Sequence, residues 1–203
     1  MTRILQSAQG LAEQATDESR RFHRISIALH WVTVLLILVQ FTSAWLHEAA
    51  DENGRLAAAI LATHRASGML TWIVVLVRLV WRQGFAHLPP FPEDMSKLQQ
   101  SITTANEYSL YVLLFTQPIT GLSRVLFRGE SFGLLIWQVP ALLQPDPEIR
   151  NFFLAAHEFG AKALLVLVGL HAGAALFHRL VLRDGVLNRM LPWSSKPTPG
   201  ARP

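Results

Sequence analysis

Histidines supply the main candidate chemistry of this sequence. The chain has eight histidines and no cysteine, which excludes disulfides, thiolate metal sites, iron–sulfur clusters and covalent haem attachment through a Cys-x-x-Cys-His motif. Ionisable side chains inside apolar segments are costly and usually functional. Four histidines lie within long apolar runs, namely His30, His64, His157 and His171.

The spacing of these four histidines predicts two pairs. His157 and His171 are fourteen residues apart, which on a helix separates them by only ~40° around the axis and by ~21 Å along it. His64 and His157 lie nine and seven residues after the arginine at the outer end of their runs. His30 lies six residues after, and His171 eight before, an arginine at the inner end. His64 can therefore meet His157 near the outer side, and His30 can meet His171 nearer the inner side.

Two pairs of neutral imidazoles at two depths fit two haem groups, each with its iron held from both sides. Small residues would leave room for a flat macrocycle: Gly68 lies one turn after His64, and four surround His171, namely Gly169, Ala172, Gly173 and Ala174.

Other uses of buried histidines stay open at this point. A proton relay or metal-transport pathway normally adds carboxylates at mid-membrane, whereas Glu107 and Glu158 lie near the ends of their runs. Zinc requires three or four ligands at one point, which paired histidines at two depths do not provide. Separate structural hydrogen bonds between helices are the third possibility. The histidines at the ends of apolar runs, His23, His47 and His87, receive no role.

Four apolar runs must position these side chains. They cover residues 26–46, 60–81, 106–127 and 154–182, each near the ~20 residues that a bilayer-crossing helix needs. The chain is 51% hydrophobic and only 16% charged. The sequence therefore predicts an all-α membrane protein, a bundle of four transmembrane helices, with a kink at Pro118 in the third.

Basic residues predict the orientation of the bundle. Twelve Lys and Arg residues flank one side and five flank the other, so the positive-inside rule places both termini in the cytoplasm. The net charge of +4 comes from residues beside apolar runs, not from a basic stripe with interleaved aromatics, so nucleic acid is not an expected partner. The expected partner is the lipid bilayer.

The remaining segments give the domain organisation. We expect a tail or interfacial helix at 1–21, one helical domain at 22–192 and a disordered tail at 193–203, which is rich in Pro and Ser. The apolar stretch FGLLIWQVPALL, residues 132–143, is too short to cross a membrane and is predicted to form a short helix in the interface.

Several motifs resemble the bacterial cytochrome b561 family of four-helix di-haem b cytochromes. They run in family order over about residues 22–192, and together they are specific. These motifs are SIALHW at 26–31, THRASG with RLVWR within 63–82, YVLLFTQPITG at 111–121, FGLLIWQVP at 132–140, AHEFGA at 156–161 and GLHAGAALFHRLVLRDGVLNRMLP at 169–192.

The resemblance implies a membrane cytochrome with two haem b groups. The family's axial ligands fall on His30, His64, His157 and His171. It also implies electron exchange with ubiquinone in the bacterial inner membrane. Members of the family include a superoxide oxidase, which passes electrons from superoxide to quinone, and cytochrome b subunits of larger dehydrogenases or hydrogenases. The oligomeric state does not follow from the sequence.

Cationic and polar residues at the two ends are further candidates. Near the inner end, His178, Arg78 and Ser26 are predicted quinone contacts, with haem propionates as the alternative partner of Arg78. Near the outer end, cations would attract an anion such as superoxide, with interfacial snorkelling as the alternative role for each. These outer cations are Arg65, Arg124, Arg128 and Lys162.

Two positions depart from the family pattern. Members often carry a histidine one turn before the third-span tyrosine, where this chain has Glu107 before Tyr111. Many also have a second histidine directly after His178, where this chain has Arg179. Both departures concern the inner-side quinone contacts and leave the predicted haem ligands unchanged.

Overall fold

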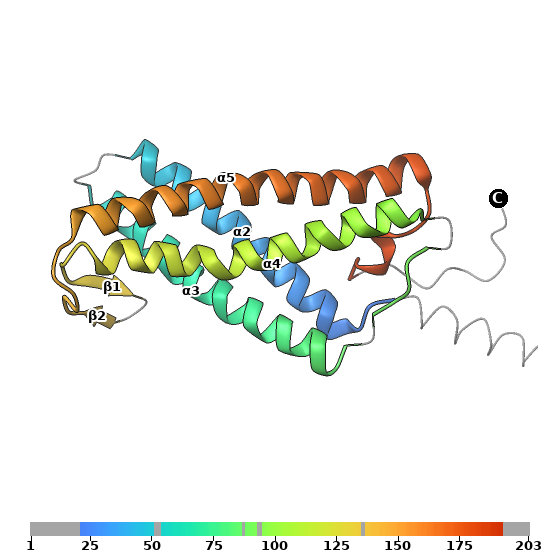
Figure 1. Ribbon diagram of the computed structural model, residues 1–203, viewed down its shortest axis with the longest axis horizontal. Helices are drawn as coiled ribbons and strands as arrows, with labels where there is room; N and C mark the ends of the chain where they lie inside the picture. The colour runs from blue at the N-terminus through green and yellow to red at the C-terminus, as the bar shows by residue number, and fades with distance from the viewer. Residues whose placement is uncertain (1–20, 51–53, 87, 93–94, 135–136, 193–203) are drawn as a thin grey trace, which may run out of the picture.

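Four long helices form the bundle in the computed structural model, which describes residues 21–50, 54–86, 88–92, 95–134 and 137–192 (Figure 1). The helices are α2 (Arg24–Ala49), α3 (Arg55–Gly84), α4 (Lys97–Leu126) and α5 (Pro147–Phe177). Each predicted span coincides with one helix, and the fourth continues from α5 into a π-helical turn at His178–Leu182. The predicted all-α bundle of four helices is thus confirmed. Of the predicted tails at 1–21 and 193–203, all residues except Arg21 lie outside the described residues.

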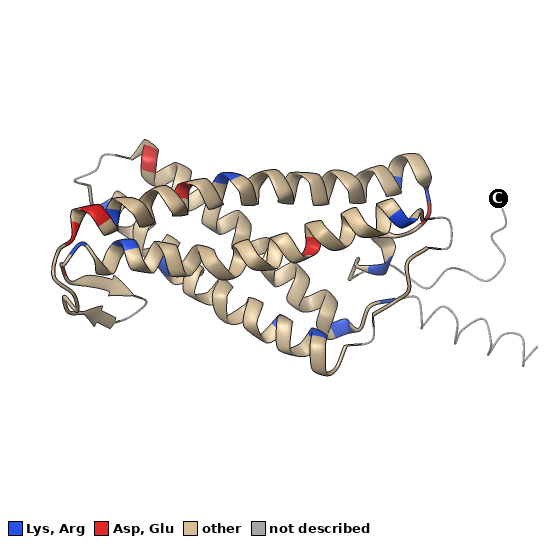
Figure 2. Cartoon of the chain, viewed as in Figure 1, with Lys and Arg blue, Asp and Glu red and all other residues tan. Residues whose placement is uncertain are grey.

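Most of the bundle has the length and composition of a membrane protein. Within the described part of the chain, α2, α3 and the segment Pro147–Leu182 are long and apolar enough to cross a membrane. Helix α4 is as long as α3, at 30 residues, but its first turns are polar (KLQQSITTANE) and lower its mean hydropathy. Charged residues gather mainly toward the two ends of the bundle (Figure 2), as expected for helices whose middle lies in hydrocarbon.

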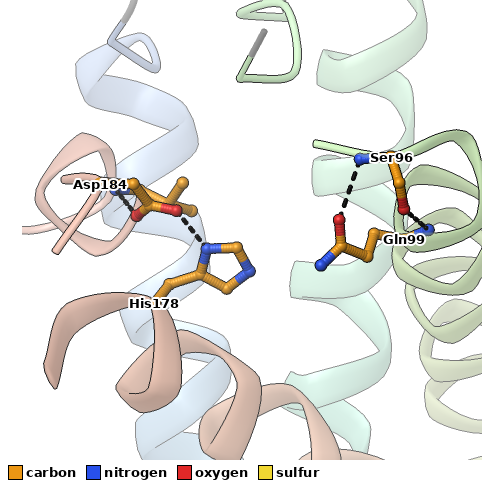
Figure 3. Close-up of polar contacts among 5 residues, drawn as sticks. Ser96, Gln99, His178 and Asp184 are labelled. Atoms are coloured by element: carbon orange, nitrogen blue, oxygen red, sulfur yellow. Dashed lines mark hydrogen bonds and ion pairs between the residues drawn. The ribbon is translucent and has the colours of Figure 1, made fainter. Parts of the chain in front are cut away.

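Local capping explains where α4 and α5 begin. The Ser96 hydroxyl accepts a hydrogen bond from the Gln99 backbone N–H at 3.3 Å, and the Gln99 side chain accepts one from the Ser96 N–H at 2.9 Å (Figure 3). This capping box satisfies two N–H groups that a helix start leaves without partners. Asp146 does the same for α5, since its carboxylate accepts from the N–H groups of Glu148 and Ile149. Helix α4 runs through Pro118 without ending.

The helices pack as two hairpins, α2 with α3 and α4 with α5, which meet mainly along α3 and α4. The buried centre of the bundle consists of Val75, Tyr111, Leu114 and Leu164. Leu164 lies seven residues from both His157 and His171 on α5. An apolar layer therefore separates the two depths at which the histidines occur.

The segment after α5 folds back across one end of the bundle. Arg183 adopts a left-handed conformation (φ 54°) and ends the π-helical turn. The indole N–H of Trp31 then donates to the carbonyl of Met190 at 2.8 Å, and Arg189 donates to the carbonyl of Pro90 at 2.9 Å. The start of α2 and the end of α5 consequently lie at the same end of the bundle (Figure 1).

The predicted interfacial helix at 132–143 is wrong. Two short antiparallel strands occupy this place, β1 (Phe132–Leu134) and β2 (Trp137–Val139), with Phe132 opposite Val139 and Leu134 opposite Trp137. Gly133 weakens a helix, and Pro140 cannot continue one, so an α-helix has too few favourable residues here. Aromatic and β-branched residues at 132, 137 and 139 favour strands instead.

Candidate functional site

The four intramembrane histidines form two facing pairs. The ring centres of His30 on α2 and His171 on α5 are 6.2 Å apart. Those of His64 on α3 and His157 on α5 are 6.3 Å apart. The pairing predicted from depth is therefore the one that the structure has, and α5 contributes one histidine to each pair.

The outer pair, His64 and His157, is held through its Nδ1 atoms. His64 Nδ1 lies 3.2 Å from the carbonyl oxygen of Gln40 and 3.1 Å from the Ser43 hydroxyl. His157 Nδ1 lies 3.1 Å from the carbonyl oxygen of Gln117 and 3.1 Å from the Thr120 hydroxyl.

A backbone carbonyl only accepts hydrogen bonds, so each Nδ1 of the outer pair must carry the proton. Both Nε2 atoms then keep the free lone pair that a metal ligand requires. The hydrogen bonds thus select the ligand-competent tautomer of both rings.

The inner pair, His30 and His171, has a different environment. His30 Nδ1 is buried and has no hydrogen-bond partner among the residues that the structure describes. The charge of Arg78 acts on both rings, and its guanidinium carbon lies 5.3 Å from the centre of the Tyr111 ring. The carboxylate of Glu107 acts on His171 with the opposite sign, so charged groups, and not a hydrogen bond to His30 Nδ1, are what the surroundings add here.

Glu107, one of the departures from the family pattern, forms an ion pair with Arg82. The guanidinium contacts the two carboxylate oxygens at 2.5 and 3.1 Å, and both side chains are largely covered. A bidentate pair of this kind holds both groups in one geometry. Glu107 therefore neutralises Arg82, while Arg78 one turn earlier on α3 remains beside the inner histidines.

The predicted quinone contacts come from three elements at the inner end. Ser26 on α2 accepts a hydrogen bond from the indole N–H of Trp81 at 3.0 Å. His178 Nδ1 forms a short contact with the Asp184 carboxylate, and its other ring nitrogen faces away from Asp184 (Figure 3). Within the described part of the chain, no hydrogen bond joins His178 to Ser26 or Arg78.

Three of the four predicted steering residues gather at the outer end. Arg65, Arg124 and Arg128 are close enough for their charges to repel one another. Arg65 and Arg128 line a surface pocket of about 340 Å³ beside β1. Arg150 lies beside Arg124 and extends this positive group, a member that sequence reasoning missed. We call Arg65, Arg124, Arg128 and Arg150 the outer arginine cluster.

Lys162, the fourth predicted steering residue, is exposed on α5, and its charge is not among those that act on Arg65 or Arg124.

Comparison with known sequences now identifies the family. A sequence profile of prokaryotic cytochrome b561 matches residues 21–193, which is most of the chain. The protein belongs to the prokaryotic cytochrome b561 family. Family membership makes it a b-type haem membrane protein that transfers electrons.

Curated relatives agree with this assignment. Cytochrome b561 homolog 1 of Escherichia coli is 27% identical over 175 residues, which cover 85% of this chain and 97% of the relative. The probable superoxide oxidase CybB of Yersinia pestis is 26% identical over 178 residues, with the same coverage. Cytochrome b562 of Cereibacter sphaeroides is 24% identical, over 84% of this chain and 94% of its own length.

The geometry of both histidine pairs fits a haem iron. An imidazole nitrogen binds a metal at about 2 Å, so two imidazoles on opposite sides of one iron have ring centres about 6 Å apart. A direct hydrogen bond would bring the facing nitrogens to about 3 Å and the ring centres closer than observed. The described residues contain no group of three or more His, Asp or Glu side chains that could bind a metal ion by themselves. An iron between two histidines would therefore need ligands from another source. Haem supplies those further ligands from its own four nitrogens.

The glycines predicted to leave room for a macrocycle have different surroundings in the cytochrome. A Cβ at Gly169 or Gly173 would meet nothing within 4 Å, so the room predicted near His171 stays a prediction. The space at Gly68 is instead taken by the side chain of Gln40. Gly121, which the sequence did not single out, is the glycine against a histidine: its Cβ would be 3.1 Å from His157 Cε1.

Sequence reasoning also missed the side chains that orient the outer pair. Gln40 and Ser43 on α2 match Gln117 and Thr120 on α4 in spacing, as Gln-x-x-Ser and Gln-x-x-Thr. The repeated spacing of a glutamine and a hydroxyl, once in each hairpin, was the available signal. By itself, this spacing does not differ from the scattered polar residues that membrane helices commonly contain.

The pKa of Asp184, which lies beyond the last membrane-spanning residue, is below its ordinary value of 3.8. Partial burial raises it, but hydrogen bonds from His178 and from the backbone N–H of Val186 lower it by more. The ionised carboxylate therefore stabilises the turn after α5. That contribution is complete above the ordinary pKa and is lost as the pH falls through the lowered pKa.

We expect Asp184→Asn to remove this acid-sensitive part of the stability. The thermal unfolding midpoint, measured in detergent from about pH 3 to pH 7, should be lower for the variant at neutral pH and should converge with wild type at the acid end. Glu48→Gln, which removes an exposed carboxylate at the other end of the bundle, is the matched control. A difference that stays constant at all pH values would contradict the assignment.

Proposed function

We propose that this protein carries electrons from a donor at the outer face of the bacterial inner membrane to ubiquinone near its inner face, with both termini cytoplasmic. His64 and His157 hold one haem b, and His30 and His171 hold a second. The observation that carries the proposal is the presence of two facing histidine pairs, with ring centres 6.2 and 6.3 Å apart, at two depths of one bundle. Haem held by two histidines supplies one-electron transfer with no open position at the iron.

The outer arginine cluster supports superoxide as the donor. Two carboxylates lie among the four guanidinium groups, Glu130 in an ion pair with Arg128 and Glu158 beside Arg124, so this end keeps a net positive charge. That charge attracts an anion by electrostatic steering, and the pocket beside Arg65 and Arg128 gives it a place to bind. Each superoxide gives up one electron and leaves as O₂. Two superoxide anions therefore reduce one ubiquinone, which takes up two electrons and two protons.

The inner end supports the quinone contact. Asp184 orients the His178 ring through Nδ1, and in the imidazolium form Nε2–H is free to donate a hydrogen bond to a quinone carbonyl. The Ser26 hydroxyl accepts from Trp81 and keeps its own proton to donate. Arg78 either joins them or binds the propionates of the inner haem. The apolar layer around Val75 and Leu164 excludes water between the two depths.

The outer arginine cluster also fits a second candidate function. A positive surface of this kind can bind an acidic redox protein, which would make the chain the cytochrome b subunit of a dehydrogenase or hydrogenase. Anaerobic reduction by superoxide, with the purified chain alone and quinone as acceptor, distinguishes the two. An ion transporter without haem, the third possibility left open by the sequence, is not supported by the family assignment.

Replacing one histidine of each pair tests the haem assignment. We expect His157→Ala and His171→Ala each to reduce haem content from two per chain to one, because each removes one of the two histidines that would hold that haem. Pyridine haemochrome spectra per mole of protein provide the measurement. His47→Ala, at the end of α2, is the control and should retain both. A His157→Ala or His171→Ala protein with two haems per chain would rule out that ligand.

Removing outer arginines tests steering. Arg124→Gln with Arg128→Gln should lower the second-order rate of reduction by superoxide roughly threefold to tenfold at low salt, and the difference should vanish at high salt. Lys162→Gln, a cation of equal charge away from the cluster, should have a smaller effect. A wild-type rate that does not depend on ionic strength would count against steering.

Replacing His178 tests the quinone contact. His178→Ala should keep both haems and the rate of reduction by the donor, but slow quinone reduction about tenfold or more, because a positioned hydrogen-bond donor and proton source is lost. Stopped-flow absorbance separates the two half-reactions. Arg179→Gln, the adjacent residue, controls for local disturbance of the turn. Loss of a haem in His178→Ala would show a structural role instead.

A further inference from the structure

The outer histidine pair is held by two copies of one hydrogen-bonded unit. In the first copy, His64 Nδ1 contacts the backbone carbonyl of Gln40 at 3.2 Å, and the Gln40 side-chain amide donates to the backbone carbonyl of His64 at 2.8 Å. The side chain of each residue thus forms a hydrogen bond with the backbone carbonyl of the other. The two bonds fix the rotation of α2 against α3 and the orientation of the ring together.

The second copy joins α4 to α5 in the same way. His157 Nδ1 contacts the carbonyl of Gln117 at 3.1 Å, and the Gln117 amide donates to the carbonyl of His157 at 3.1 Å. The same polar unit therefore occurs once in each helical hairpin, on opposite sides of one candidate haem site. We call each copy a glutamine–histidine latch.

Glycines give both latches the room they need. A Cβ at Gly68 would approach the Gln40 amide nitrogen to 3.3 Å, and a Cβ at Gly160 would approach the Gln117 amide nitrogen to 3.0 Å. Both distances are shorter than ordinary van der Waals contact. The second helix of each hairpin thus carries a glycine where the glutamine side chain crosses it.

A hydroxyl completes each latch, and its single proton decides its role. Ser43 donates to the Gln40 carbonyl at 3.0 Å, and Thr120 donates to the Gln117 carbonyl at 2.9 Å. Because each hydroxyl has already donated its one proton, it can only accept a hydrogen bond from the histidine Nδ1–H. Each Nδ1–H of the outer pair is consequently shared between two oxygen acceptors, a carbonyl and a hydroxyl.

This hydrogen bonding distinguishes the two sites electronically. An acceptor at Nδ1–H raises the basicity of the imidazole as a metal ligand, and more electron-rich ligands favour ferric over ferrous iron. His30 Nδ1 has no such acceptor within the described residues. Charges do not separate the sites in the same way, because Arg78 and Glu107 act at the inner pair while Arg65, Arg124 and Glu158 act at the outer pair. The hydrogen bonding therefore lowers the reduction potential of the outer site relative to the inner one.

We propose that Gln40, Ser43, Gln117 and Thr120 are positioning residues that set the reduction potential of the outer haem below that of the inner haem. Electrons that enter at the outer arginine cluster then move inward energetically downhill. The inference rests on the proposed function, since it requires a haem between His64 and His157.

Hydroxyl-deleting variants of the purified holoprotein test the inference by potentiometry. Ser43→Ala with Thr120→Val should raise the lower of the two midpoint potentials and leave the higher one unchanged. We expect the ratio of oxidised to reduced outer haem at a fixed potential to fall about tenfold, which is 59 mV for a one-electron couple. Repeating the titration in His171→Ala, which is expected to retain only the outer haem, assigns the shifted potential to that site.

Two further variants separate the latch from general packing. Thr116→Val is one turn earlier on α4, where the threonine donates to the Val112 carbonyl and does not contact a histidine, so both potentials should stay at wild-type values. Thr120→Ser keeps the hydroxyl and loses only a methyl group, and it should retain the wild-type potential even if Thr120→Val loses haem.

The outcomes distinguish this inference from the proposed function. A wild-type protein without two haems would overturn both. Two haems in wild type, with unchanged potentials in Ser43→Ala and Thr120→Val, would overturn the latch inference alone. An equal shift of both potentials would also overturn it, because the effect would then not belong to the outer site.

Discussion

The two imidazoles of α5 are the groups on which the arrangement of the other helices depends. A hydrocarbon environment offers no water to a polar ring, so His157 and His171 each need partners from protein or cofactor. They share a face at two depths, which requires one neighbouring helix to bring His64 to the outer level and another to bring His30 to the inner level. Helices α3 and α2 do this, and the apolar layer around Leu164 fills the space between.

The two sites differ although the histidine pairs look alike. At the outer site, carbonyls and hydroxyls from Gln40, Ser43, Gln117 and Thr120 surround both Nδ1 atoms. At the inner site, His30 Nδ1 has no hydrogen-bond partner among the described residues. Both sites have charged neighbours, Arg65 and Arg124 outside and Arg78 and Glu107 inside, so hydrogen bonding at Nδ1 is the difference between them.

The sequence predicted the depth of each residue well and its rotational neighbours poorly. Rise per residue is nearly constant in a helix, so counting from flanking arginines was enough to pair His64 with His157 and His30 with His171. The orientation of one helix about its axis relative to the next is not encoded in any single helix. This is why Gln40 and Gln117 were missed, and why Gly68 was assigned to a macrocycle instead of a glutamine. The β1–β2 hairpin was missed because a short apolar stretch does not distinguish strand from helix by hydropathy.

The departure at Glu107 has an electrostatic consequence for the inner site. Two arginines, Arg78 and Arg82, lie one turn apart on α3, and both guanidinium groups approach the Tyr111 ring. The carboxylate of Glu107 forms a bidentate contact with Arg82. It also acts on His171, with a sign opposite to that of Arg78, whereas His30 is exposed to Arg78 without this counter-charge. A neutral histidine in place of Glu107 would leave the charge of Arg78 on His171 unopposed, so the carboxylate reduces the positive field at the inner site without removing it.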